Sequence, residues 1–231
     1  MTEVDVTHMT PELLVSDFAG TLMLEEGAVA DAYRAAFAAF EIQYSEADIV
    51  ARRGASKLGV FLDLAARSYP AEQVEQIARA GLERFQAELD RAYREQPVEP
   101  IPGVEGALRA LRDAGICLAV TSGFPRSLMS SLIERLGWTD LFETAVSADD
   151  VTAGRPAPYL IFKAMIDLGV QDVRRVAVVG DTALDLEAGN RAGAAWVIGV
   201  LSGAHDLPQL GRVRHTHLLP SVAGLPELFG V

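Results

Sequence analysis

The sequence has only one cysteine and lacks any long apolar run. Cys117 lies in the apolar stretch Ile116 to Val120 and cannot form an intramolecular disulfide, so we expect a buried, inert thiol in a reducing compartment. No apolar stretch approaches the roughly 18 residues that a membrane-spanning helix needs. Residues 1–10 have neither the basic nor the apolar region of a secretory signal. We therefore expect a cytoplasmic protein.

Positive charge is also scarce. The chain has 20 Lys and Arg residues against 32 Asp and Glu residues, which gives a formal net charge of -12. This excess of negative charge would repel nucleic acid and acidic membrane surfaces, so neither is an expected partner. A phosphorylated substrate would need a local pocket of positive charge. The apolar fraction of 50% is ordinary for a globular protein, and 231 residues suffice for a core domain with a smaller companion.

Helix and strand patterns divide the chain into two parts. The apolar residues 13–15 run into Asp17 and then a turn, which indicates a buried strand. Residues 28–94 have helical periodicity, and the prolines and glycine of residues 97–103 cannot continue a helix. After this linker, helices alternate with short apolar strands at 116–121, 144–147, 176–180 and 196–200.

This alternation predicts an α/β fold with a Rossmann-like parallel sheet. The helical segment is then an insertion after the first strand. We place the α/β core at residues 1–24 and 97–231 and a small helical cap domain at residues 25–96.

Four polar motifs lie where predicted strands give way to loops or helices. They are Asp17-Phe18-Ala19-Gly20-Thr21, Thr121-Ser122-Gly123, Gly154-Arg155-Pro156 and Gly180-Asp181-Thr182-Ala183-Leu184-Asp185. Each alone could be a turn, a helix cap or a surface ion pair. The ends of parallel strands converge on one crevice, however, and carboxylates gathered there would bind a hard cation such as Mg²⁺. The four motifs together favour one shared site.

The order of these motifs, with a helical insertion after the first, resembles the haloacid dehalogenase superfamily. The resemblance covers nearly the whole chain and implies hydrolysis through a phosphoaspartate. It implies that Asp17 is the nucleophile and a metal ligand, and that Ala19 supplies a backbone carbonyl to the metal. Asp181 and Asp185 would complete the Mg²⁺ site, one directly and one through water.

The resemblance also assigns residues to the phosphoryl group. Thr121 would bind the phosphoryl oxygens through its hydroxyl, helped by the neighbouring backbone N–H groups of Ser122 and Gly123. Arg155 stands where most members of the superfamily have a lysine, and it would neutralise charge in the site.

The alanine at position 19 indicates which subfamily of the superfamily the chain resembles. Most phosphatases of the superfamily have an aspartate at this position, which acts as general acid and base, whereas a methyl group can transfer no proton. Phosphonatases, which cleave the carbon–phosphorus bond of phosphonoacetaldehyde, share both the Asp-x-Ala-Gly-Thr and the Gly-Arg-Pro patterns. The chain is similar to this subfamily.

Phosphonatase chemistry also needs a cap lysine that forms a Schiff base with the aldehyde. Lys57, in Gly54-Ala55-Ser56-Lys57, lies close to where the phosphonatase cap has its Gly-x-x-Lys, and only one other lysine, Lys163, is present. A solvated helical lysine is the alternative. The surroundings differ: Arg53, Val60 and Phe124 stand where phosphonatases have a methionine, a histidine and an aromatic hydroxyl.

Three functions remain open from the sequence. The first is a phosphonatase-like hydrolase of a small phosphonate or aldehyde-bearing substrate. The second is a phosphomonoesterase of small metabolites such as a phosphoglycolate-like compound, and the third is a catalytically silent binding protein. A cap-to-cap homodimer is implied only by the resemblance.

Overall fold

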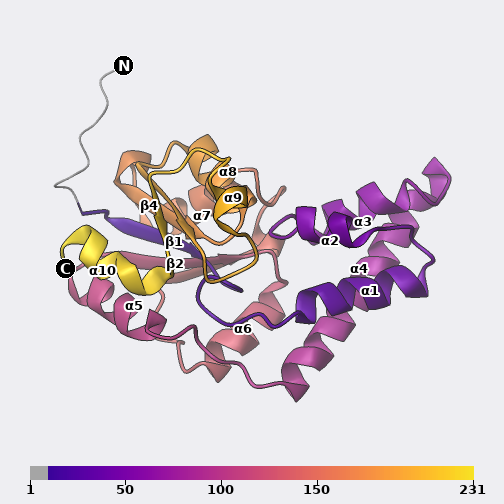
Figure 1. The fold of residues 1–231 in the computed structure, drawn as a ribbon, viewed down its shortest axis with the longest axis horizontal. Coiled ribbons are helices and arrows are strands. Elements are labelled where there is room, and N and C mark those ends of the chain that lie inside the picture. The colour runs from indigo at the N-terminus through magenta and orange to yellow at the C-terminus, as the bar shows by residue number, and fades with distance from the viewer. Residues whose placement is uncertain (1–9) are drawn as a thin grey trace.

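The computed structural model describes residues 10–231, which form a six-stranded sheet and a separate helical lobe (Figure 1). The sheet has the order β3-β2-β1-β4-β5-β6, and every neighbouring pair is parallel. Its strands are β1 (Leu13–Asp17), β2 (Cys117–Ser122), β3 (Thr144–Ser147), β4 (Val176–Gly180), β5 (Trp196–Val200) and β6 (His217–Leu219). The predicted α/β fold with a parallel sheet is confirmed.

Helices cover both faces of this sheet. They are α5 (Val104–Asp113), α6 (Arg126–Arg135), α7 (Tyr159–Leu168), α8 (Ala183–Ala192), α9 (Leu207–Leu210) and α10 (Leu225–Phe229). Side chains alternate along a strand, so Leu14 of β1 packs in the cluster that includes α5, α6 and α10. Leu13 and Val15 pack on the opposite face, against α7 and α8. Burial on both faces explains why the strands read as continuous apolar runs.

The segment between β1 and α5 contains four helices that project to one side of the sheet (Figure 1). They are α1 (Ala28–Ala39), α2 (Glu46–Ala51), α3 (Lys57–Ala65) and α4 (Ala71–Glu95). Four fully buried aromatic rings join α1, α3 and α4: Tyr33, Phe37, Phe61 and Phe85. Close packing of α3 on α4 requires Gly81, because a β-carbon there would lie 2.7 Å from Cδ1 of Phe61.

The structure differs from the sequence analysis in two details. We expected a buried Cys117, but this residue is only partly buried because it is the first residue of β2. The short helix α9 was not predicted, because four residues are too few for a helical period to show in sequence. Within residues 10–231, no helix combines the length and the apolar character that a bilayer span requires. The exact boundaries of the cap stay a prediction.

Candidate active site

The site lies where β1, β2 and β4 end. Asp17 is the last residue of β1 and is in register with Thr121 of β2, while Asp181 directly follows the last residue of β4. Because the strands are parallel, their carboxyl ends meet at one edge of the sheet. Asp185 joins them from the first turn of α8. The structure therefore brings together the three aspartates that the sequence analysis selected.

Carboxylate oxygens of Asp17, Asp181 and Asp185 lie within 4.8 Å of one another, and all three residues are buried. Burial, which removes water from the carboxylate, raises the pKa of Asp17 to about 8; Arg155 opposes this shift, and Asp185 and Asp181 add to it. Burial likewise raises the pKa of Asp181 to about 6, with a further contribution from Asp185. Three carboxylates face one guanidinium, that of Arg155, and their oxygens are the kind of ligand that hard cations prefer, so the cluster could hold a metal ion.

Arg155 is the cation that faces this cluster among the described residues. Its Nη1 atom lies 2.5 Å from Oδ1 of Asp17 and also pairs with Oδ1 of Asp185. The side chain is only 5% exposed, and its Nε–H has no hydrogen-bond partner within residues 10–231. The guanidinium thus bridges the carboxylate at the end of β1 and the carboxylate in the first turn of α8, and its Nε–H is without a partner among residues 10–231.

The carboxylate of Asp181 is held by two hydrogen bonds and by close contact with Gly20. Its Oδ1 accepts a hydrogen bond from the Thr21 hydroxyl at 2.9 Å, and its Oδ2 accepts one from the Ala204 N–H at 2.7 Å. Gly20 has a φ of +88°, and a β-carbon there would lie 2.6 Å from Oδ2 of Asp181. A side chain at position 20 would therefore be strained and would also displace this carboxylate.

The last residue of β2, Ser122, and the next two residues, Gly123 and Phe124, form part of the wall of a cavity of about 150 Å³. Asp17, Ala19 and Arg155 line the same cavity. Thr121 has a different environment. Its hydroxyl donates to the carbonyl of Ser16 at 3.2 Å, and it does not line this cavity. Ser122 lines the cavity, and its Oγ accepts a hydrogen bond from the Phe124 N–H at 3.1 Å.

The helical lobe reaches the site through residues 53–57, between α2 and α3. Lys57 is the first residue of α3, is 7% exposed and lines the same cavity as Asp17. A β-carbon added to Gly123 would lie 3.9 Å from its Nζ, and the amine also stands 5.5 Å from the centre of the Tyr33 ring. Burial lowers the pKa of Lys57 to about 8; Arg155 and Arg53 lower it further, whereas Asp17 and Glu25 oppose the shift.

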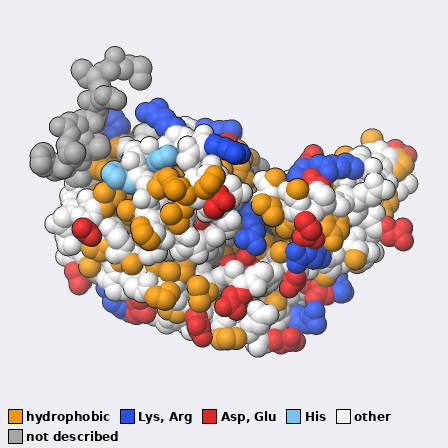
Figure 2. All heavy atoms as spheres, viewed as in Figure 1, with side chains coloured by type: hydrophobic (Ala, Val, Ile, Leu, Met, Phe, Trp, Pro, Cys, Tyr) orange, Lys and Arg blue, Asp and Glu red, His pale blue; other side chains and the backbone are white. Residues whose placement is uncertain are grey.

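Glycines allow the lobe to approach this closely. Gly54 has a φ of +80°, and a β-carbon there would lie 2.6 Å from Oγ1 of Thr182. A β-carbon on Gly154 would lie 3.3 Å from the Cβ of Ser56. The segment therefore rests on three core loops, with Lys57 directed inward. Figure 2 shows the resulting hollow between the two lobes, with basic and acidic side chains in it.

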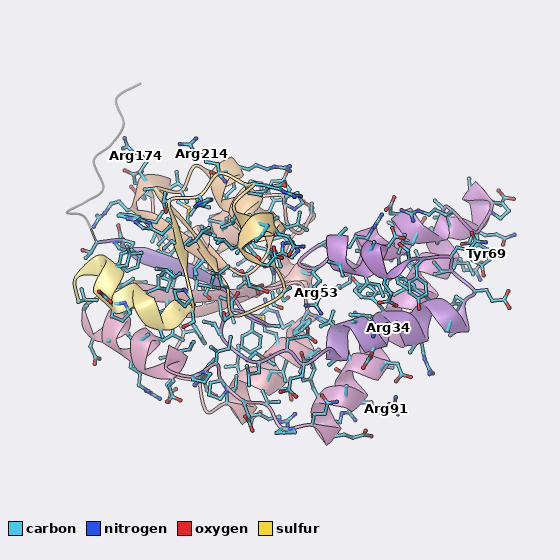
Figure 3. The ribbon with its side chains drawn as sticks, in the orientation of Figure 1. Arg34, Arg53, Tyr69, Arg91, Arg174 and Arg214 are labelled. Carbon is cyan, nitrogen blue, oxygen red and sulfur yellow. The ribbon has the colours of Figure 1, made fainter. Side chains whose placement is uncertain are left out.

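Two further residues of the cavity, Glu25 and Arg53, were not selected as functional from the sequence. Arg53 Nη2 lies 3.4 Å from Oε2 of Glu25, and Figure 3 places Arg53 at the junction of the two lobes. Glu25 follows the first motif by only a few residues and precedes a helix, so it reads in sequence as an ordinary charge near a helix start. Its carboxylate is held by the N–H groups of Gly27 and Val29 and lies beside Arg53.

The sequence matches the family model for haloacid dehalogenase-like hydrolases over residues 11–193. A curated protein from Parabacteroides distasonis, named phosphonoacetaldehyde hydrolase, is 37% identical over 111 residues. That stretch covers 47% of this chain and 41% of the relative, so the chain matches less than half of the length of this relative.

Two solved structures share the fold. A hydrolase from Pseudomonas syringae has a TM-score of 0.83 at 21% identity, with 95% of this chain and 99% of that chain covered. A phosphonoacetaldehyde hydrolase like protein from Oleispira antarctica has a TM-score of 0.81 at 20% identity, with 100% and 95% covered.

Proposed function

Because the chain belongs to the haloacid dehalogenase-like hydrolase family, we propose that it hydrolyses a small organophosphorus metabolite through a phosphoaspartate on Asp17. The observation that carries this proposal is the position of Asp17, a buried carboxylate beside Arg155 that faces a cavity shared with Lys57. The core of residues 1–24 and 97–231 holds the phosphorus chemistry. The cap of residues 25–96 closes over it and excludes water.

Mg²⁺ is the cation that suits the aspartate cluster, because three buried carboxylates face a single guanidinium. Asp17, Asp181 and the backbone carbonyl of Ala19 would hold the ion directly. Asp185, whose Oδ1 pairs with Arg155, would contribute through water. When bound, the ion neutralises negative charge on the phosphoryl oxygens.

The residues around Asp17 would hold the phosphoryl group in line with its carboxylate. Arg155 offers its remaining donors to the phosphoryl oxygens, and the Ser122 hydroxyl and the Gly123 N–H offer further hydrogen bonds. We assign the hydroxyl contact to Ser122, since Thr121 donates to Ser16. Asp17 then attacks phosphorus, and the bond from phosphorus to the leaving group breaks.

Lys57 decides which bond breaks. Its neutral amine condenses with the aldehyde of phosphonoacetaldehyde, releasing water and forming an imine, which takes up one proton from solvent to become an iminium ion. As Asp17 attacks phosphorus, the electron pair of the carbon–phosphorus bond moves into the iminium, which becomes an enamine. Protonation of carbon and hydrolysis then free acetaldehyde and Lys57, while water hydrolyses the aspartyl phosphate. No acid is needed at position 19, because the leaving group is carbon.

A phosphomonoesterase is the second candidate. Val60 and Phe124 are both buried apolar residues and provide no proton-transferring group beside Lys57. In that case Lys57 attracts an anionic substrate and forms no imine. The leaving oxygen would then need a proton from a group other than Ala19.

Phosphate release with Mg²⁺ from a panel of phosphonoacetaldehyde and common phosphomonoesters tests these candidates. Turnover of phosphonoacetaldehyde alone supports the phosphonatase-like reaction, and turnover of esters alone supports the phosphomonoesterase. No release from any compound would contradict both and would favour a catalytically silent binding protein.

A further inference from the structure

Glu25 lies in the linker between β1 and α1, where the chain passes from the core into the cap. Its Oε1 accepts hydrogen bonds from the N–H groups of Gly27 and Val29, both at 3.0 Å. These donors belong to the start of α1 and have no partner within the helix. The carboxylate is therefore fixed by the first turn of a twelve-residue helix, and its side chain is only 8% exposed.

The second oxygen of Glu25 is directed differently. Oε2 lies 3.4 Å from Nη2 of Arg53, beyond ordinary hydrogen-bond length. Both residues line the cavity that contains Asp17 and Lys57. Figure 3 shows Arg53 between the sheet and the helical lobe. At 3.4 Å its guanidinium is the charged partner nearest to Oε2 but leaves this oxygen able to accept a short hydrogen bond. Glu25 thus presents one constrained carboxylate oxygen to the site.

Hydrolysis of an aspartyl phosphate requires a group that accepts a proton from the attacking water. Four carboxylates line the cavity: Asp17, Glu25, Glu26 and Asp181. Asp17 carries the phosphoryl group at this stage, and Asp181 belongs to the metal-binding cluster. Glu26 is exposed to solvent. Ala19, two residues after Asp17, has only a methyl group and cannot accept a proton. Glu25 is the remaining buried carboxylate of this set.

We propose that Glu25 is the general base of the second half-reaction, an inference that rests on the proposed phosphoaspartate mechanism. Oε2 takes a proton from water as the water oxygen bonds to phosphorus. The bond from phosphorus to the Asp17 oxygen then breaks, which releases inorganic phosphate and restores the Asp17 carboxylate. The proton on Glu25 returns to solvent or, with an ester substrate, to the leaving oxygen of the next turnover. The role is the same whether the first step breaks a C–P or an O–P bond.

Glu25→Gln tests this role, because the amide oxygen still accepts hydrogen bonds from Gly27 and Val29 but no longer acts as a base. We expect a first burst of organic product equal to the enzyme concentration, measured by rapid quench with the substrate that the panel identifies. Steady-state phosphate release should fall on the order of 10²-fold or more. Intact-mass measurement should show one added phosphoryl group, and peptide mapping should place it on Asp17.

Glu26→Gln is the matched control, since it removes the adjacent, exposed carboxylate from the same cavity. It should show neither the burst nor the added mass. Glu25→Asp, which keeps a carboxylate, should recover part of the phosphate release and also serves if Glu25→Gln does not fold, as judged by circular dichroism. Equal losses of burst and steady state in a folded Glu25→Gln protein, or undiminished phosphate release, would overturn the role of Glu25. Failure of the proposed function is distinguishable, because then Asp17→Asn leaves the phosphate release of the protein unchanged, whatever residue stands at position 25.

Discussion

The core and the cap supply the cavity in different ways. The core contributes side chains at the ends of hydrogen-bonded strands, as in the register of Asp17 with Thr121, so their positions follow from the sheet itself. The cap contributes Arg53 and Lys57 from one connection that rests on the core through close contacts such as Gly54 on Thr182. A side chain on a sheet edge keeps its place as long as the sheet exists, whereas one on a docked lobe depends on closure. In the mechanism we propose, the core therefore performs the general phosphorus chemistry and the cap chooses the bond that breaks.

Asp17→Asn should cause the largest loss of turnover, because it removes the proposed nucleophile of the core, which every substrate would use. The amide is nearly isosteric with the carboxylate but is neither an anionic nucleophile nor a good Mg²⁺ ligand. We expect turnover to fall by several orders of magnitude on all substrates while the fold is kept, as measured by phosphate release and circular dichroism. A variant that retains more than about a tenth of the wild-type rate would contradict the phosphoaspartate mechanism.

Lys57→Arg should separate the contribution of the cap to activity from that of the core. Arginine keeps the positive charge but cannot form an imine, so carbon–phosphorus cleavage should be abolished while any phosphomonoester hydrolysis by the core survives. Borohydride added with phosphonoacetaldehyde should leave a stable mass adduct on the wild-type peptide that contains Lys57 and none on the variant. An unmodified Lys57 together with unchanged ester hydrolysis in Lys57→Arg would reject the phosphonatase mechanism.

Arg155→Lys should reduce turnover less than Arg155→Ala. Lysine keeps the charge beside Asp17 but loses the planar fork that can hold a carboxylate and a phosphoryl oxygen together. We expect a loss on the order of tenfold for Lys and 10²-fold or more for Ala, read from kcat/KM. Three proteins of equal activity would place Arg155 outside the site.

The pH dependence of borohydride trapping should report the environment of Lys57 directly. Burial lowers the pKa of Lys57 from 10.5 to about 8, so the neutral amine becomes more abundant as the pH rises through 8. The initial trapping rate should therefore rise from pH 6 to pH 8 by a factor of about 50 and level off above that. A rate that keeps rising beyond pH 10 would show an ordinary, solvated lysine.

A pair of glycine substitutions compares the packing of the two regions and should have the smallest effect on activity. In α4 of the cap, the added methyl group of Gly81→Ala meets Phe61 and should lower the free energy of unfolding by about 1–2 kcal/mol. In α5 of the core, Gly106→Ala meets nothing within 4 Å and should raise it by up to about 1 kcal/mol. Urea denaturation measures both, and a stabilising Gly81→Ala would mean that the cap repacks around Phe61.

The fold was predictable because strand and helix periods alternate clearly after residue 103 and end at recognisable polar motifs. Asp17, Asp181 and Asp185 were predictable as a cluster because parallel strands align their carboxyl ends. The orientation of Thr121 and Ser122 was not predictable, since one residue of uncertainty in the end of a strand exchanges its two faces. The burial of Glu25 depends on contacts across the cap, which no local pattern contains.

The sheet order has a consequence for the way the protein is made. Strand β1 precedes the other strands of residues 10–231, yet its neighbours in the sheet begin at Cys117 and Val176, so both are synthesised long after it. Helices α1 and α3 both pack on α4 within one contiguous segment, so these contacts can form before the neighbours of β1 are synthesised. We therefore expect the cap helices to pack before the sheet is complete, which leaves the apolar strand Leu13–Asp17 without partner strands during that interval.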